Sequence, residues 1–519
     1  MALCLSKSRK FLAHLKPKMG VLGMMNLSSW SSCLSRKQAS LSGNGRIPHA
    51  FFWNRPPLFT SRRFESVKAD IQLGSLRPAG DPQVSSGTAV FTIFSNLKEV
   101  SSDNPEMRVS HADGRLVMIC EVRRDSKVLN FPGGIVKFTP ELKFLSDFPE
   151  ERIHCYRVLD DSGQPISNNF VQIDKDVAVK MYKDMVTFQT MDTIFYEAQR
   201  QGRISFYVTA IGEEAINIAS AAALTMDDIV FPQYREAGVL LWRGFTLQEF
   251  ANQCFGNKGD NGKGRQMPAH YGSNKHNYVT VASTVATQIP HAVGAAYSLK
   301  MDGRDACTIT YFGDGGTSTG DFHAALNFAA VMEAPVILFC RNNGWAISTP
   351  VSDQFRSDGI VVRGQAYGVR SIRVDGNDTL AVFSAVHVAR KMAISESRPV
   401  LIEALTYRAG HHSTSDDSSK YRPIEEIEWW RAAQDPVARF RKWLEGQGWW
   451  TAQSEIELRD RARQEVLHAI QVAEKVEKPP IREIFTDVYD VPPSNLRDQE
   501  KSLRGTIERH PQDYPHFPL

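Results

Sequence analysis

The sequence predicts an α/β fold, a doubly wound parallel sheet with a helical C-terminal extension. Two short apolar runs, residues 307–312 and 336–340, are rich in β-branched and aromatic residues, as buried parallel strands are. Between them, apolar residues at helical spacing predict a helix over residues 319–332, which ends before Pro335. Strand, helix and strand in this order form a crossover unit, so the carboxyl ends of both strands should lie at one edge of the sheet.

Polar residues follow both of these strands. Asp314 comes after the first strand and Asn342–Asn343 after the second, at the edge where open α/β sheets bind ligands. Carboxylate and amide oxygens suit Mg²⁺ that holds a diphosphate, and glycine lets the backbone approach phosphate closely. The glycines concerned are Gly313, Gly315 and Gly316. An ordinary crossover unit with a glycine turn is the alternative, and the spacing of the asparagine pair favours the binding site.

Composition describes a water-soluble globular protein. Of the 519 residues, 42% are hydrophobic and 23% charged, and no apolar run approaches the roughly 20 residues of a membrane span. The seven cysteines include no C-x-x-C pair, so neither a zinc site nor a disulfide framework is expected. A chain of this length has room for about two to four domains.

The N-terminal region differs from the rest in charge. Residues 1–64 contain no Asp or Glu but many Lys, Arg and Ser, which predicts a mitochondrial transit peptide and a place in the mitochondrial matrix. A basic arm that binds nucleic acid is the alternative; we expect neither nucleic acid nor membrane as a partner. Residues 65–130 are expected to be a linker or poorly ordered insert, with a small separate domain as the alternative. Residues 131–480 form the predicted α/β domain and residues 481–519 a C-terminal tail.

Further elements follow from periodicity and from glycine and proline signals. Strands are expected at residues 88–94, 157–159, 228–231, 370–374 and 399–406. Helices are expected at residues 176–201, from 212 onward, 289–300, 379–396, 424–445 and 453–478. The first of these helices has a methionine-rich face, which indicates core or a subunit interface. The glycine-rich stretch 256–273 is expected to be a mobile loop.

Two further positions have the chemistry of a binding or catalytic site. Arg235 follows the strand at 228–231, beside Gln233 and Tyr234, where its guanidinium could hold a phosphate. His412 lies in the loop after the strand at 399–406, and histidine ordinarily titrates near neutral pH, which suits proton transfer. The alternative is that His412 is a solvated loop histidine with no catalytic role.

Several longer motifs carry a resemblance to a known family. From about residue 131 to its end, the chain resembles the α subunits of the decarboxylating component of branched-chain 2-oxo acid dehydrogenase complexes. The last motif below distinguishes it from the pyruvate dehydrogenase α subunits, and the pair G-D-G and N-N resembles the thiamine diphosphate motif. The motifs are R-Q-G-R-I-S-F-Y (200–207), Q-Y-R-E-A-G-V-L (233–240), G-K-G-R-Q-M-P (262–268), A-T-Q-I-P (286–290), C-R-N-N-G (340–344) and G-H-H-S-T-S-D-D-S-S (410–419).

The resemblance implies thiamine diphosphate, Mg²⁺ and K⁺ as cofactors, and assigns residues to each. The Mg²⁺ ligands would be Asp314, Asn343 and the main-chain carbonyl of Trp345. The remaining cofactor contacts would be Gln233, Tyr234, Arg235, Ser283, Val285, Gly313, Gly315, Gly316, Arg341 and His412, with Arg235 and Arg341 on the diphosphate and Ser283 and Val285 near the pyrimidine. The K⁺ ligands would be the carbonyls of Ala282 and Thr284 together with Thr287 and Gln288. Here the sequence departs from the family, which has proline and leucine where this chain has Thr284 and Val285.

The resemblance also implies a reaction and partners. The chain would decarboxylate branched 2-oxo acids, with His412 as the catalytic residue. Branched substrates imply an apolar pocket, for which Phe206 and Tyr207 are candidates from this chain. The acyl group would pass to a lipoyl-lysine of the transacylase core. A separate β subunit would complete an α2β2 tetramer, and a kinase and phosphatase would act on Ser413. An α subunit acting on pyruvate or acetoin, and a non-catalytic regulatory subunit, are the alternatives.

Overall fold

The computed structural model describes residues 151–514 without interruption, together with residues 89–92, 108–112, 115–120, 128–131, 134–137, 139–142 and 144–146. The chain divides into two compact units, residues 1–138 and 139–519. The predicted transit peptide, residues 1–64, lies outside the described residues. Among those that are described, no helix is long and apolar enough to cross a membrane.

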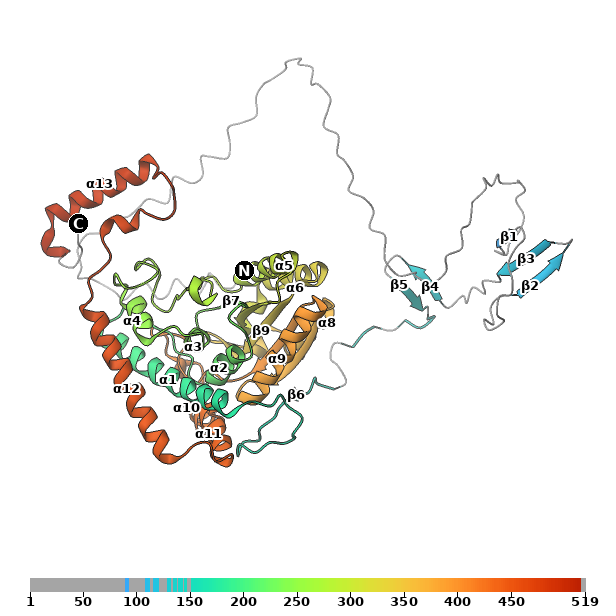
Figure 1. Cartoon of the computed structure of the whole chain (residues 1–519), viewed down its shortest axis with the longest axis horizontal. Coiled ribbons are helices and arrows are strands. Elements are labelled where there is room, and N and C mark those ends of the chain that lie inside the picture. Colours follow the sequence, from blue (N-terminus) through green and yellow to red (C-terminus); the bar gives the residue numbers. More distant parts are fainter. Residues whose placement is uncertain are drawn as a thin grey trace, which may run out of the picture. The chain divides into compact units, whose positions relative to one another are not determined.

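The larger unit is built on a six-stranded, wholly parallel sheet, which confirms the predicted fold class (Figure 1). The predicted crossover is confirmed, because β8 and β9 are adjacent and the helix α6 (Gly320–Met332) connects them. The strands lie in the order β6 (Cys155–Tyr156), β12 (Arg370–Asp375), β13 (Val400–Leu405), β9 (Val336–Asn342), β8 (Thr308–Gly313) and β7 (Ile229–Phe231).

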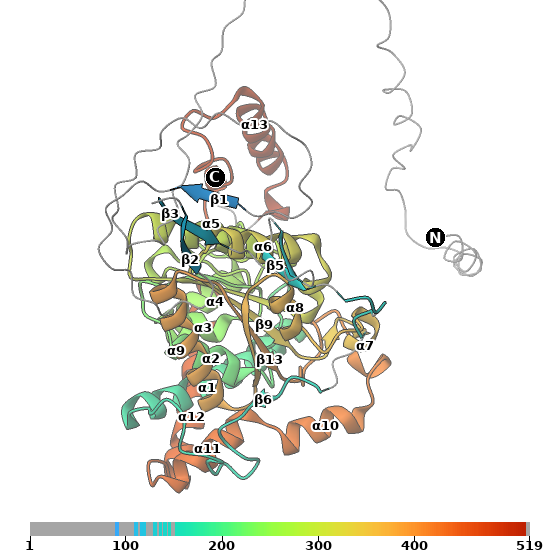
Figure 2. The same cartoon turned by 90° about the vertical axis from the view of Figure 1, so that its right-hand side faces the viewer.

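Helices cover both faces of this sheet, because successive strand residues point to opposite sides. Ile309 and Tyr311 of β8 belong to one hydrophobic core, and the next residue, Phe312, belongs to the other. Figures 1 and 2 show the strands between the two layers of helices. The first core contains α1 (Lys175–Arg200), α2 (Glu214–Ala222), α3 (Ala237–Trp242) and α9 (Thr379–Glu396), and the second contains α5 (Gln288–Met301) and α6.

The methionine-rich face of α1 is core rather than subunit interface. Met181, Met185 and Met191 are fully buried within this chain. Large apolar side chains are exposed instead on α5 and α6, where Met301, Phe328 and Val331 are 65%, 50% and 71% exposed.

The predicted strand at residues 157–159 is wrong. The edge strand β6 ends at Tyr156, where it pairs with Val374. Beyond it, the backbone N–H groups of Val158 and Leu159 donate to the buried carboxylate of Asp378, at 2.7 and 2.6 Å, instead of to the sheet. A side chain from a distant part of the chain therefore ends the strand.

The predicted single helix at residues 424–445 is also wrong, because the structure has two, α10 (Ile424–Ala433) and α11 (Pro436–Gly446). Pro436 is the first residue of α11, where a missing N–H costs nothing, and the Asp435 carboxylate accepts the N–H of Val437 at 3.0 Å. In a continuous helix, the proline ring would clash with the preceding turn.

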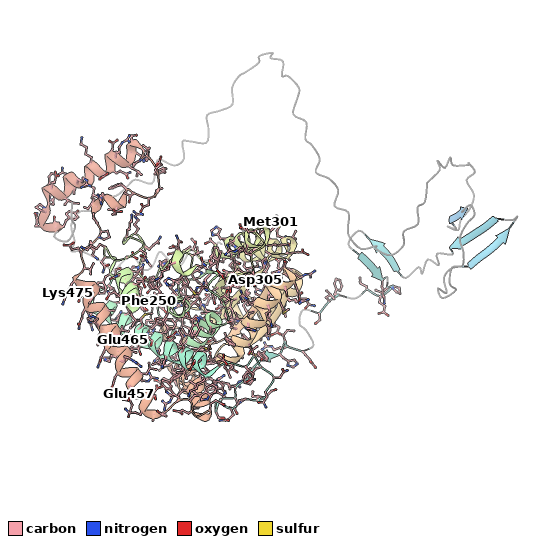
Figure 3. The ribbon with its side chains drawn as sticks, viewed as in Figure 1. Phe250, Met301, Asp305, Glu457, Glu465 and Lys475 are labelled. Carbon is pink, nitrogen blue, oxygen red and sulfur yellow. The ribbon has the colours of Figure 1, made fainter. Side chains whose placement is uncertain are left out.

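The C-terminal part contains two more helices, α12 (Ala452–Lys475) and α13 (Ser494–Arg509). Helix α12 buries Leu458 and Val466 and packs on α1 and α4 (Leu247–Phe255). Its Glu457, Glu465 and Lys475 lie on the outer side, whereas Phe250 of α4 lies within (Figure 3). Helix α13 occupies the tail, for which the sequence analysis predicted no element.

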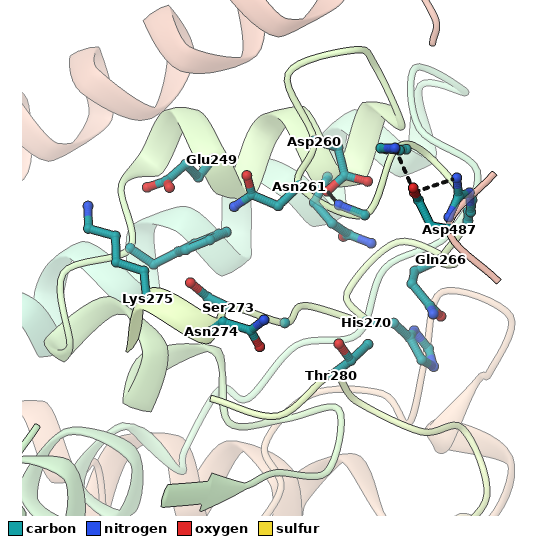
Figure 4. Close-up of a pocket in the computed structure, with 16 residues that line it drawn as sticks. Glu249, Asp260, Asn261, Gln266, His270, Ser273, Asn274, Lys275, Thr280 and Asp487 are labelled. Carbon is teal, nitrogen blue, oxygen red and sulfur yellow. Dashed lines mark hydrogen bonds and ion pairs between the residues drawn. The ribbon is translucent and has the colours of Figure 1, made fainter. Parts of the chain in front are cut away.

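The glycine-rich stretch 256–273 is tied to the segment after α12. Lys263 forms ion pairs of 2.6 Å with Glu483 and with Asp487, and Arg265 lies 3.0 Å from Asp487. Figure 4 shows Asp487 bonded to both cations at the rim of a polar cavity of about 550 Å³ between this loop and α4. The loop expected to be mobile is thus held by ionic contacts to the C-terminal segment.

The smaller unit contains antiparallel strands. β1 (Ala89–Thr92), within the run predicted at 88–94, pairs with β3 (Arg115–Cys120), which pairs with β2 (Arg108–Ala112). A hairpin of β4 (Val128–Phe131) and β5 (Gly134–Lys137) follows and crosses the predicted boundary at residue 130. Residues 65–130 therefore contain more regular structure than the single expected strand.

Candidate functional site

A cavity of about 410 Å³ lies at the carboxyl ends of β8 and β9. Register explains the location, because Gly313 pairs with Arg341 and Asn342 with Leu405, so three neighbouring strands end together. The cavity is lined by all the residues that the sequence analysis assigned to thiamine diphosphate and Mg²⁺, which are Gln233, Tyr234, Arg235, Ser283, Val285, Gly313, Asp314, Gly315, Gly316, Arg341, Asn343, Trp345 and His412. Thr319, Ala346, Ile347 and Arg408 also line it and were not predicted.

The glycine turn after β8 is crowded by the opposite wall of the cavity. A Cβ placed on Gly315 would lie 2.7 Å from the Cβ of Ala346 in β10 (Trp345–Ala346). The N–H of Gly313 donates to Oε1 of Gln233 at 3.0 Å. Glycine is therefore required at residue 315 for steric reasons.

Asp314 is a buried carboxylate whose negative charge has few protein partners. It is 1% exposed, and Nε2 of Gln354 donates to its Oδ2 at 2.6 Å. Burial raises the pKa of Asp314 above its usual value, and within the described chain no Lys or Arg lies within ion-pair distance of it. A buried carboxylate without a cation is costly, so bound Mg²⁺ would fit this position.

Arg341 is surrounded by acceptors that belong to the protein. Its Nε donates to Glu236, Nη1 donates to Glu213 at 2.7 Å, and Nη2 donates to Oε1 of Gln233 at 3.1 Å. Glu213 and Glu236 are fully buried. The two carboxylates neutralise the guanidinium, so Arg341 contributes less positive charge to the cavity than the sequence suggested.

Two other arginines supply that charge. Arg235 is 3% exposed, and its Nη2 donates to the carbonyl of His412 at 2.6 Å. Arg408 donates to the carbonyls of Trp345 and Ile347 at 3.2 and 3.0 Å, and its buried Nε has no hydrogen-bond partner. Arg408 follows a predicted strand at the same sheet edge, and that position was the signal that could have identified it.

His412 is neutral at physiological pH. Burial, together with the neighbouring Arg235 and Arg408, lowers its pKa to about 3, which corrects the expectation of titration near neutrality. Its Nδ1 lies 3.2 Å from Nη2 of Arg235, and because arginine can only donate, Nδ1 accepts and the ring proton is on Nε2. The loop is held by Asp416, whose carboxylate accepts the N–H of His412 at 2.8 Å.

The residues assigned to K⁺ form a turn beside the cavity. Thr287 Oγ1 lies 2.8 Å from Thr284 Oγ1, and Gln288 Nε2 donates to the carbonyl of Tyr311 at 2.8 Å. Oε1 of Gln288 is buried and has no hydrogen-bond partner. An unpaired buried oxygen is what a cation ligand requires, so the side chains here fit a hard cation such as K⁺.

Tyr207 does not reach the cavity. Its ring stacks on Phe195, and its hydroxyl donates to the buried Asp192 at 2.8 Å. Neither Tyr207 nor Phe206 lines the cavity, so the expectation that they contact substrate from this chain is not supported. Tyr207 is a core residue.

Comparison with known proteins agrees with this geometry. A family model described as "Dehydrogenase E1 component" matches residues 182–482. The chain belongs to the dehydrogenase E1 component family.

Named relatives cover most of this E1 component chain. It is 71% identical over 396 residues to the 2-oxoisovalerate dehydrogenase subunit alpha 2, mitochondrial, of Arabidopsis thaliana, a match that covers 76% of this chain and 84% of the relative. The alpha 1 subunit of the same organism is 62% identical over 431 residues, 83% of this chain and 90% of the relative. The corresponding human subunit alpha is 50% identical over 390 residues, 75% of this chain and 88% of the relative.

Proposed function

We propose that this E1 component chain is the α subunit of a mitochondrial 2-oxoisovalerate dehydrogenase. It decarboxylates branched-chain 2-oxo acids with thiamine diphosphate and transfers the acyl group to a lipoyl-lysine of the transacylase core. The observation that carries the proposal is the cavity at the carboxyl ends of β8 and β9, because it collects the motif residues of five separate segments of the chain. Identity of 71% to a 2-oxoisovalerate dehydrogenase subunit supports the choice of substrate class.

The cavity side chains fit thiamine diphosphate and Mg²⁺. We assign Asp314, Asn343 and the carbonyl of Trp345 to the metal, supported by the uncompensated burial of Asp314. Arg235 and Arg408 balance the diphosphate charge, and the Gly315–Gly316 backbone lies open to it. When bound, the cofactor supplies a nucleophilic carbon and accepts the electron pair left behind by carbon dioxide.

We assign K⁺ to the turn that precedes α5. Its ligands are the carbonyls of Ala282 and Thr284, with Thr287 and Gln288. The unpaired Oε1 of Gln288 supports this assignment. Main-chain carbonyls remain available when threonine stands in place of proline at residue 284, and the turn positions Ser283 and Val285 in the cavity wall.

His412 is the residue we assign to acyl transfer. With Nδ1 accepting from Arg235, its Nε2–H can donate a hydrogen bond to an oxygen or sulfur atom of the reacting group. The depressed pKa keeps the imidazole neutral, so His412 acts as a hydrogen-bond donor through Nε2 rather than as a base. This arrangement suits transfer to a dithiolane. One sulfur bonds to the acyl carbon, the S–S bond breaks, and the Nε2–H hydrogen bond can stabilise the negative charge on the other sulfur until that sulfur takes a proton from water.

We propose that a β subunit completes the enzyme as an α2β2 tetramer, because the relatives that this chain resembles are themselves named as alpha subunits. The exposed side chains of Met301, Phe328 and Val331 support α5 and α6 as its contact surface. We further propose the lipoyl transacylase core, a kinase and a phosphatase as partners, with Ser413 as the phosphorylated residue.

Residues 1–64 would be removed on entry to the mitochondrial matrix, leaving residues 65–130 as an insert, 131–480 as the catalytic domain and 481–519 as a tail.

Co-expression with a β subunit tests the function. The tetramer should turn over 2-oxoisovalerate much faster than pyruvate, and only with thiamine diphosphate and Mg²⁺ present. Equal or greater turnover of pyruvate would overturn the substrate assignment. Absence of any cofactor-dependent turnover in a correctly assembled tetramer would indicate a regulatory subunit.

A further inference from the structure

Glu213 lies behind the cavity, at the start of α2, and connects two of its walls. Its side chain is fully buried. Oε1 accepts from Nδ2 of Asn343 at 2.7 Å, and Oε2 accepts from Nη1 of Arg341 at 2.7 Å. Glu213 does not line the cavity, so any effect on a ligand passes through these two residues.

The hydrogen-bond partners of Glu213 decide how Asn343 is oriented. One carboxylate oxygen of Glu213 forms a buried ion pair of 2.7 Å with Nη1 of Arg341, and the other faces the amide of Asn343. An ionised carboxylate can only accept hydrogen bonds. The amide nitrogen of Asn343 must therefore face Glu213, and Oδ1 must face the opposite way.

Oδ1 of Asn343 has limited protein contacts. It accepts the N–H of Trp345 at 3.2 Å, which leaves one of its two lone pairs available. Asn343 and Asp314 line the same cavity. The reversed amide would instead place two N–H donors toward the N–H of Trp345 and toward any cation, and neither contact is favourable.

We propose that Glu213 is a positioning residue that locks the Asn343 amide with its oxygen toward the cation in the cavity. This inference rests on the proposed Mg²⁺ site. A purely structural role, neutralising Arg341, is the competing explanation. It is weakened because Glu236 already pairs with Arg341, and the other oxygen of Glu236 accepts from the N–H of Gln233 rather than from Asn343.

Three variants in the α2β2 tetramer separate these explanations. Glu213→Gln keeps the shape but offers an amide to two donors, so its nitrogen would face Asn343 and favour the reversed amide. Asn343→Asp alone would place two carboxylates face to face and should also disturb the site. Glu213→Gln/Asn343→Asp restores one donor and one acceptor at this contact and leaves an oxygen toward the cation. Its net charge equals that of the wild type.

The measurement is binding of Mn²⁺, as a paramagnetic probe for Mg²⁺, in the presence of thiamine diphosphate. We expect each single variant to bind Mn²⁺ at least tenfold more weakly than wild type, and the double variant to recover wild-type affinity or better. Thermal melting and tetramer assembly are measured in parallel. A single variant that fails to assemble, next to a double variant that assembles and binds, also supports the inference.

Three outcomes would overturn it: Glu213→Gln binds Mn²⁺ like the wild type, the double variant regains no affinity, or the double variant does not assemble. Failure of the proposed function gives a different result, because the wild-type tetramer would then bind no Mn²⁺ with thiamine diphosphate.

Discussion

Gly315→Ala tests whether the cofactor cavity depends on the close approach of the glycine turn to β10. The added Cβ would lie 2.7 Å from the Cβ of Ala346, whereas ordinary van der Waals contacts of a Cβ atom begin at 3.4 Å. Ala346 must therefore move by several tenths of an ångström or more, and with it Trp345, whose carbonyl we assign to the metal. Overpacking of this kind costs about 1–3 kcal/mol.

If this cost falls on the bound state, affinity for thiamine diphosphate should drop by roughly 5- to 150-fold, since about 1.4 kcal/mol corresponds to tenfold. Isothermal titration of the tetramer with cofactor and Mg²⁺ measures this drop, and thermal melting shows how much of the cost falls on folding. Gly315→Ala/Ala346→Gly removes the clash and should restore affinity. Gly320→Ala is the matched control, because a Cβ there meets no atom within 4 Å.

The reasoning fails if Gly315→Ala binds the cofactor and melts like the parent. It also fails if the compensating glycine at residue 346 does not rescue binding. A similar loss in Gly320→Ala would show that the effect is not steric.

Three other predictions follow from the same geometry. Asp314→Asn should abolish Mg²⁺ binding yet raise the melting temperature of the cofactor-free protein at pH 7. Because burial raises the pKa of Asp314 in the folded state, the stability of the wild type falls as the pH rises from the usual aspartate pKa through the raised one. The asparagine variant should lack this pH dependence. An unchanged pH profile of melting would contradict this. Phosphorylation of Ser413 adds roughly −1.5 to −2 charge beside Asp416, whose carboxylate accepts the backbone N–H of His412 at 2.8 Å. Repulsion between the phosphate and Asp416 should release this loop, so kinase treatment should stop acylation of lipoyl domains by the wild type but not by Ser413→Ala. The isolated α chain should self-associate through the exposed apolar side chains of α6. Val331 is 71% exposed, so Val331→Glu should reduce light scattering of the isolated chain and weaken tetramer assembly. A monodisperse wild-type α chain would remove the basis for this prediction.

The sequence alone predicted the sheet, most of its strands and the motif residues of the cavity. Buried parallel strands are short apolar runs that can be recognised locally, and parallel pairing necessarily brings their carboxyl ends to one edge. Asp314 and Asn343 each follow such a strand, so their meeting in one cavity could be inferred without coordinates. The break at Pro436 was also present in the sequence, as a proline inside a helical pattern, and was missed.

The tertiary structure decided the features that depend on side chains far apart in the chain. The end of β6 is set by Asp378, more than 200 residues away, which takes the N–H groups of Val158 and Leu159. The neutral state of His412 is set by its burial next to Arg235 and Arg408, and no local pattern records that environment. The orientation of Asn343 is set by Glu213, which precedes it by 130 residues. Local sequence patterns predict which groups reach the sheet edge, but proton positions and amide orientations depend on the fields and hydrogen bonds of whichever segments the fold packs behind them.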